Sequence, residues 1–144
     1  MIPWNMYSNV LLLAFLIFAE AEGEPVEGKM YVAATAINMS VMRHTTLREE
    51  ILRPHRYSGM HGKRIEKIVH SYNQGTLDDV HVWKTCLALA SSMVQCYYVS
   101  LMTGLPMAPG VTHFGNWNKV KMPKCFKKLT FVKKIGNHWF YTGF

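Results

Sequence analysis

Thr76 to Gly104 reads TLDDVHVWKTCLALASSMVQCYYVSLMTG and contains the longest helix that the sequence predicts. Thr76-Leu77-Asp78-Asp79 is typical of a helix N-terminus, because a threonine cap and acidic first-turn residues satisfy free N–H groups and the helix dipole. Gly104 suits a C-cap, and Pro106 cannot continue a helix. We therefore predict one long central helix over about Thr76–Thr103.

This helix has two conceivable environments. Residues 85–107 carry no charge, so a membrane span over that range is one interpretation. Polar side chains nevertheless recur at helical spacing and form a stripe along one side: His81, Lys84, Thr85, Ser91, Ser92 and Gln95. A half-polar helix suits the core of a soluble domain better than a lone span in lipid. We favour the soluble core helix and keep the span as the alternative.

The N-terminus resembles a secretory signal in its hydropathy. Val10 to Ala19 is an uninterrupted apolar run, too short for a bilayer span but suited to a signal core, and Ala19-Glu20-Ala21 has the small-x-small cleavage pattern. We predict a signal peptide over residues 1–21. Because residues 1–9 lack lysine and arginine, an uncleaved anchor and a buried N-terminal helix remain alternatives.

Residues 22–105 are predicted to form a helical region. Thr46 to Leu52 is expected to be a short helix that Pro54 stops, and Arg64 to Tyr72 an amphipathic one. The apolar stretch from Met30 to Met42 suits a buried helix or a strand, and its length does not decide between them.

Two short motifs in this region matter only in a secreted chain. Asn38-Met39-Ser40 is a glycosylation sequon, which makes Asn38 a candidate site, but a glycan needs an exposed loop. We favour burial of this segment, which excludes use of Asn38. Gly62-Lys63-Arg64 has the pattern at which prohormones are cut and amidated, although Lys63 and Arg64 equally suit the start of the next helix.

The chain has three cysteines, which do not form a disulfide framework. Cys86 and Cys96 fall on one predicted helix about 15 Å apart, beyond disulfide reach. At most one of them can pair with Cys125, so one thiol is left over. No CxxC pattern occurs, and we expect no metal site and no cofactor.

The C-terminal segment, residues 106–144, combines aromatic residues with lysines. Leu129 to Val132 and Trp139 to Thr142 have β composition, and Gly136-Asn137 between them predicts a hairpin turn. The net charge of +7 comes almost wholly from this segment, because all nine acidic residues lie at or before Asp79. Its lysines are Lys119, Lys121, Lys124, Lys127, Lys128, Lys133 and Lys134.

These lysines suit either a plain solvated hairpin face or contact with an anionic surface, and the partner we predict is a protein, acidic lipid or a glycosaminoglycan. We do not expect nucleic acid, because no arginine follows Arg64 and a signal peptide would remove the chain from it. No GxSxG, HExxH or Walker motif is present, and Glu49 and Glu50 suit a solvated helix face. We therefore predict no catalytic residues.

In sum, the sequence predicts a mainly α protein with a small C-terminal β-hairpin, of the α+β class. The favoured function is that of a small secreted, non-enzymatic binding protein with a basic aromatic C-terminal surface. The alternative is a single-pass protein or small accessory subunit in a membrane of the secretory pathway, with a cytoplasmic lysine-rich tail. A secreted peptide precursor processed at Gly62-Lys63-Arg64 is the third hypothesis.

Overall fold

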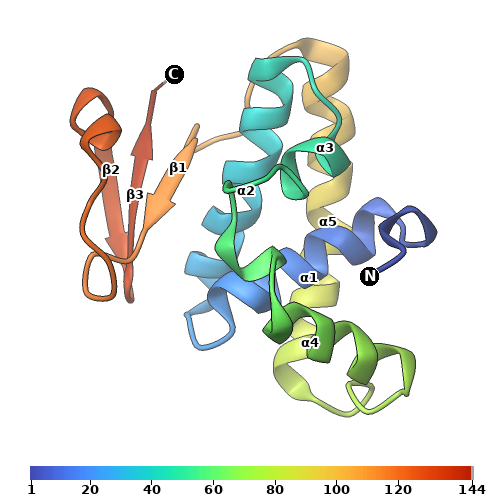
Figure 1. Ribbon diagram of the computed structural model, residues 1–144. Helices are drawn as coiled ribbons and strands as arrows, with labels where there is room; N and C mark the ends of the chain where they lie inside the picture. The colour runs from blue at the N-terminus through green and yellow to red at the C-terminus, as the bar shows by residue number, and fades with distance from the viewer. Residues whose placement is uncertain (144) are drawn as a thin grey trace.

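The computed structural model describes residues 1–143, in which a helical body (residues 1–105) lies beside a small sheet unit (residues 111–143) (Figure 1). The predicted α+β class is confirmed. The helices are α1 (Asn9–Ala21), α2 (Val26–Arg43), α3 (Leu47–Ile51), α4 (Lys63–Asn73) and α5 (His81–Thr103), with 3-10 turns η1 (Trp4–Met6), η2 (Ser58–Met60) and η3 (Lys124–Lys128). The strands are β1 (His113–Gly115), β2 (Thr130–Ile135) and β3 (His138–Thr142).

The predicted central helix is α5, and it begins later than predicted. Its N-cap is Val80, and no side chain caps it. Thr76 instead belongs to the turn that ends α4: its N–H donates to the Ser71 carbonyl, and Gly75 before it has a φ of +77°. The pattern Thr76-Leu77-Asp78-Asp79 therefore does not cap α5, because the chain uses these residues to reverse direction after α4. The predicted C-terminus is correct, since Gly104 is the left-handed C-cap.

One side of α5 packs into the core of the helical body. Its buried residues are Trp83, Cys86, Ala90, Met93, Val94, Tyr97 and Ser100. The predicted polar stripe lies outside this contact, with Lys84, Ser91, Ser92 and Gln95 exposed. Within residues 1–143, α5 is also the one helix long and apolar enough to cross a bilayer. In its most apolar stretch of 18 residues, 33% of the residues are buried.

The apolar N-terminal run forms α1, which lies in the middle of the helical body (Figure 1). Every residue from Leu12 to Ile17 is 0% exposed. The Phe15 ring lies 5.2 Å from that of Trp83 and 5.5 Å from that of Tyr72, between centroids. A chain cleaved after Ala21 would lose this helix, so cleavage there and this fold exclude each other.

The remaining helices match the sequence patterns closely. The apolar stretch whose form the sequence left open is helical and buried within α2. Thr46 caps α3 in a capping box with Glu49: its hydroxyl accepts from the Glu49 N–H, and the Glu49 carboxylate accepts from the Thr46 N–H. In α4 the amphipathic pattern buries Ile65, Ile68 and Val69.

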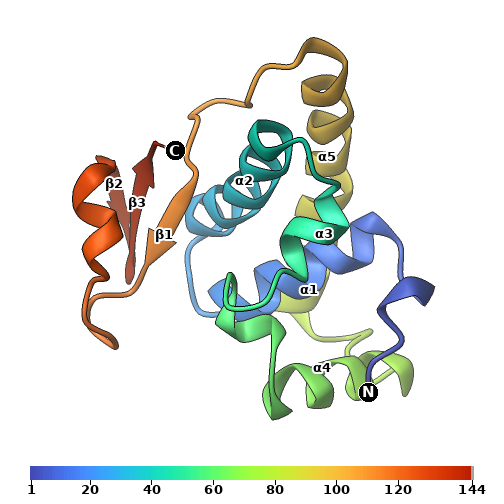
Figure 2. The same cartoon turned by 45° about the horizontal axis from the view of Figure 1, so that its top comes forward.

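The predicted hairpin exists, and a third strand completes it into a sheet of order β1-β3-β2. Ile135 pairs with His138 across the turn Gly136-Asn137, as predicted. β1 was missed because it is only three residues long, too short for a periodic pattern, and is held by pairing with β3. Figure 2 shows the linker that carries the chain from the end of α5 across to β1.

Candidate functional site

The two faces of the sheet have different surroundings. Phe140 and Phe114 belong to the inner face, where the Phe140 ring lies 5.1 Å from that of Tyr31 on α2, between centroids. Gly28 of α2 permits this approach, because a Cβ there would meet the Ile135 side chain at 3.3 Å. The helical body therefore covers Phe140 on the inner face, while the outer face and the edges stay open.

The aromatic residues of the outer face pack on one another. The Phe126 ring of η3 lies 4.9 Å from Trp117 and 5.1 Å from Tyr141, between centroids. Trp117 Nε1 donates a 2.8 Å hydrogen bond to the Tyr141 hydroxyl. Figure 2 shows η3 on the side of the sheet away from the helical body. Trp117, Phe126 and Tyr141 thus form a small aromatic cluster, in which Tyr141 is buried and the other two are half-buried.

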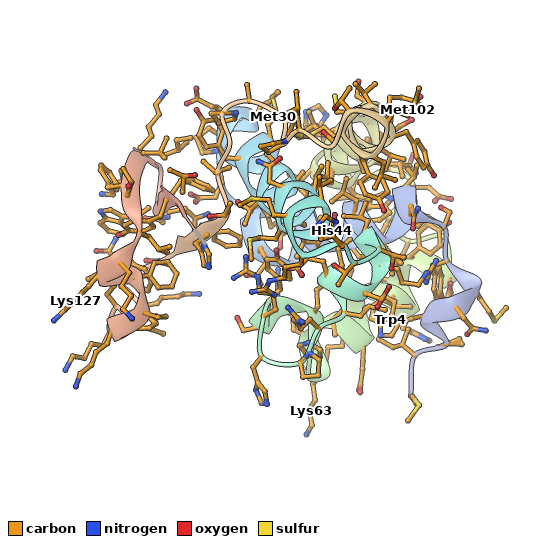
Figure 3. All side chains as sticks on the ribbon, turned by 90° about the horizontal axis from the view of Figure 1, so that it is seen from above. Trp4, Met30, His44, Lys63, Met102 and Lys127 are labelled. Atoms are coloured by element: carbon orange, nitrogen blue, oxygen red, sulfur yellow. The ribbon has the colours of Figure 1, made fainter. Side chains whose placement is uncertain are left out.

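The lysines remain outside this core. All seven predicted binding lysines are exposed, and we call them the lysine surface: Lys119, Lys121, Lys124, Lys127, Lys128, Lys133 and Lys134. Figure 3 shows Lys127 pointing away from both units. Of these seven lysines, Lys133 alone forms an ion pair within residues 1–143, with Glu27 Oε2 at 3.0 Å. Lys134 Nζ lies 4.5 Å from the Trp139 ring centroid. The lysine surface therefore consists of seven exposed positive charges on the sheet unit, of which one is paired within residues 1–143.

A groove of about 1230 Å³ runs between the sheet unit and the helical body. Its lining mixes charges: Glu20, Glu22 and Glu24, with Arg43, Arg56, Arg64, Lys119 and four histidines. Burial raises the pKa of Glu20, although its Oε1 accepts a 3.0 Å hydrogen bond from the Gly59 N–H. Burial, assisted by the charge of Arg56, lowers the pKa of His113 to about 4. The groove therefore has no single sign of charge with which to select a ligand.

Glu50 forms a charge cluster with three arginines, two of which, Arg43 and Arg56, line this groove. Its carboxylate is buried and lies 3.0 Å from Arg56 Nε, 3.5 Å from Arg43 Nη1 and 3.9 Å from Arg53 Nη1. Burial raises the pKa of Glu50 and the Arg56 charge opposes this. The predicted solvated face was wrong for Glu50, because a five-residue helix cannot show which side its neighbours cover. Arg56 also donates to the Thr112 carbonyl, so the cluster ties the sheet unit to the helical body.

Two buried polar atoms at the junction have no hydrogen-bond partner within residues 1–143: the Tyr57 hydroxyl and His138 Nδ1. Tyr57 stacks on Phe114 with centroids 6.1 Å apart, and burial raises its pKa. His138 Nδ1 lies 3.7 Å from Glu24 Oε1, and burial lowers its pKa against the pull of that carboxylate. Both residues line the groove, but these two atoms are themselves buried.

Asn38 is buried, as we expected, and it links the two units. Its amide donates to the Val111 carbonyl at 2.9 Å and to the Met107 carbonyl at 3.2 Å, while its Oδ1 accepts from the Met107 N–H at 2.8 Å. The side chain has no room for a glycan in this fold. The candidate glycosylation site is therefore a clamp on the linker before β1.

The processing motif begins α4. Gly62 is the N-cap, with a φ of +99°, and Lys63 starts the helix. Arg64 donates to the Ala19 carbonyl at 2.6 Å and to Glu22 Oε1 at 2.8 Å, which holds α4 against the end of α1. All three residues are exposed.

Neither possible pairing with Cys125, from Cys86 or from Cys96, is formed, and the three cysteines in residues 1–143 are free. Cys86 is buried in the core side of α5, whereas Cys125 is exposed on η3 in the sheet unit. Burial raises the pKa of the Cys86 thiol to about 11. Cys96 is exposed on α5.

No protein-family model matches the chain, and comparison with curated proteins and with solved structures gives no match.

Proposed function

We propose that this protein is a small, non-enzymatic binding protein whose lysine surface takes an anionic partner. One observation carries the proposal: every charged residue after Asp79 is a lysine, and the seven beyond Lys84 are all exposed on one unit. The Lys133 side chain reaches Glu27 of α2 and Lys119 lines the groove, but all seven lysines remain exposed and accessible to a partner.

The electrostatics favour binding over a purely solubilising role. Exposed charges within about 10 Å of one another act together at moderate ionic strength. Lys124, Lys127 and Lys128 lie within a single five-residue turn, η3. Their mutual repulsion is relieved when an anion approaches, and such a patch raises the local concentration of acidic partners.

A charge-matched pair of triple variants tests the proposal. Lys124→Gln/Lys127→Gln/Lys128→Gln removes three charges from η3, and Lys63→Gln/Lys67→Gln/Lys84→Gln removes three exposed charges from the helical body. At about 1 kcal/mol per lysine, the first variant should lose about 100-fold in affinity for vesicles containing phosphatidylserine and for heparin, with a flatter salt dependence. Equal losses in both variants would show a net-charge effect and overturn the proposal.

We also propose that the protein is secreted, which depends on whether the chain is cleaved after Ala21. The apolar run and Ala19-Glu20-Ala21 support cleavage, whereas burial of α1 supports retention of residues 1–21. Intact mass and N-terminal sequence, measured on medium and on cell lysate, separate the two. A chain in the medium beginning near Glu22 supports secretion of a molecule without α1, and a full-length chain in the lysate supports the retained helix. A product ending at His61 would support the peptide precursor.

Membrane association is the second candidate, and the end of α5 favours it. Large apolar side chains are exposed there: Tyr98, Val99, Leu101, Met102 and Leu105. Figure 3 shows Met30 and Met102 on the same side of the molecule. Alkaline carbonate extraction tests this candidate, because a spanning protein stays in the pellet and a protein held only by charge is released.

A further inference from the structure

β2 is an edge strand with an open side. It pairs only with β3, because the strand order is β1-β3-β2. Thr130 to Lys134 are exposed, and none of these residues has another backbone partner within residues 1–143. An edge of this kind presents a row of unpaired N–H and C=O groups to any extended chain.

The turn identifies which backbone groups are free. Ile135 and His138 flank a two-residue loop, so they form the hydrogen-bonded pair that closes the hairpin. Residues of an antiparallel pair alternate between hydrogen-bonded and non-hydrogen-bonded positions. Lys134, which pairs with Trp139, therefore turns its N–H and C=O toward the open edge.

Protection against aggregation explains the lysines of this edge but not its exposed apolar side chains. Lysines and bulges on an edge strand discourage pairing. β2 has both, in Lys133 and Lys134 and in a register shift between Phe131 and Lys133. Phe131 and Val132 on the same strand are nevertheless 52% and 36% exposed. Exposed apolar side chains on an open edge promote pairing, so this strand repels like charge while still offering apolar contact.

We infer that the open edge of β2 binds an extended acidic peptide segment as a fourth strand. The inference rests on the proposed function, because it assigns the anionic partner of the lysine surface. Strand addition supplies main-chain hydrogen bonds, and alternate side chains supply the specificity. A second copy of this chain is a poor occupant, because its own lysines would face Lys133 and Lys134.

The test uses the full chain and a labelled hexapeptide, fluorescein-Glu-Glu-Val-Val-Glu-Glu-amide, which matches the six residues of β2 and reads alike in both directions. Two variants carry the same charge loss: Lys134→Gln keeps the backbone N–H, and Lys134→Pro removes it. Proline is tolerated on edge strands. Fluorescence anisotropy should show at least about tenfold weaker peptide binding for the proline variant than for the glutamine variant. Equal affinities would overturn the inference.

A second measurement leaves the protein unchanged, in case Lys134→Pro does not fold. Peptides N-methylated at the odd or at the even positions have the same charge, but each lacks one set of N–H donors. One of the two should lose binding to the wild-type chain; equal binding of both overturns strand addition. A Lys-Lys-Val-Val-Lys-Lys peptide should not bind, and its binding would also overturn the inference.

Heparin binding by the same variants separates this inference from the proposed function. Lys134→Pro and Lys134→Gln should bind heparin equally, because heparin needs charge and no β pairing. If heparin and phosphatidylserine vesicles bind but the acidic hexapeptide does not, the strand-addition inference fails and the proposed function stands. If none of these probes binds, both fail.

Discussion

The helical body and the sheet unit are held together by different means. In the helical body, α1 and α5 bury aromatic and aliphatic side chains, with Phe15, Trp83 and Tyr72 in mutual contact. The sheet unit is small and rich in lysine, and it depends on polar links to the helical body as well as on Phe140. Stability should therefore reside mainly in the helical body, while the junction fixes the orientation of the lysine surface.

The polar links at the junction show why this difference matters. Asn38 holds the linker before β1, and Arg56 joins Glu50 to the Thr112 carbonyl. Buried polar contacts contribute modest net stability when complete, but an unpaired partner is costly. Damage at the junction should therefore alter the sheet unit more than its small size suggests.

The largest effect is expected in the helical body. Phe15→Ala leaves a cavity among the aromatic rings around α1 and should lower the free energy of unfolding by about 3–5 kcal/mol. Phe131→Ala, at an exposed position of the sheet unit, is the control and should change it by less than about 1 kcal/mol. Urea titration followed by circular dichroism measures both. A loss of less than about 1 kcal/mol for Phe15→Ala would show that α1 is not packed in the hydrophobic core.

Glu50→Gln breaks the charge cluster at the junction. It removes the carboxylate that Arg43, Arg53 and Arg56 share. Because burial already penalises the Glu50 charge and Arg43 and Arg53 reach solvent, the loss of stability should be about 2 kcal/mol. Glu49→Gln keeps the capping box and should be nearly silent. Thermal unfolding of the two variants gives the comparison, and equal Tm values would show that the cluster is not a stabilising link.

Asn38→Ala removes three hydrogen bonds and should lower stability by about 2 kcal/mol, because Met107 and Val111 keep unpaired polar groups. Ser40→Ala destroys the same sequon but spares the Asn38 side chain, so it separates glycosylation from packing. Mass spectrometry reports whether Asn38 is glycosylated, and urea titration measures the free energy of unfolding. If both variants lack the mass of a glycan that the wild-type chain carries, then Asn38 is glycosylated and its hydrogen bonds to the linker are not formed.

The smallest effect concerns pH. The folded pKa of His113 is about 4, below its usual 6.5, so the unfolded chain binds this proton first as the pH falls. Stability should thus fall between about pH 7 and about pH 4, by less than about 2 kcal/mol because solvent screens a half-buried ring. The raised pKa values of Glu20 and Glu50 act in the opposite direction at the acid end.

A matched pair of variants isolates the contribution of His113 to the pH dependence of stability. His113→Phe keeps the ring packed on Phe126 and should flatten the pH dependence, whereas His70→Phe on the exposed side of α4 should not. The readout is Tm measured across the pH range. An unchanged slope in His113→Phe would assign the pH response to other groups, with His138 as the next to test.

Local patterns predicted the elements that local physics controls. The end of α5 at Gly104, the amphipathic helix α4 and the turn Gly136-Asn137 each depend on residues close in the sequence. The position of every acidic residue before Val80 also follows from the sequence alone. These features need no distant partner, because capping, periodicity and turn preference act within a few residues.

Long-range contacts settled the rest. The apolar run from Val10 to Ala19 suits a signal peptide or a core helix equally, and only packing against Trp83 and Tyr72 places it in the core. β1 exists through pairing with β3, and Glu50 is buried through arginines on other segments. The open edge of β2 likewise depends on strand order. A short sequence pattern states which residues prefer burial or pairing, whereas the identity of their partners is a property of the folded chain.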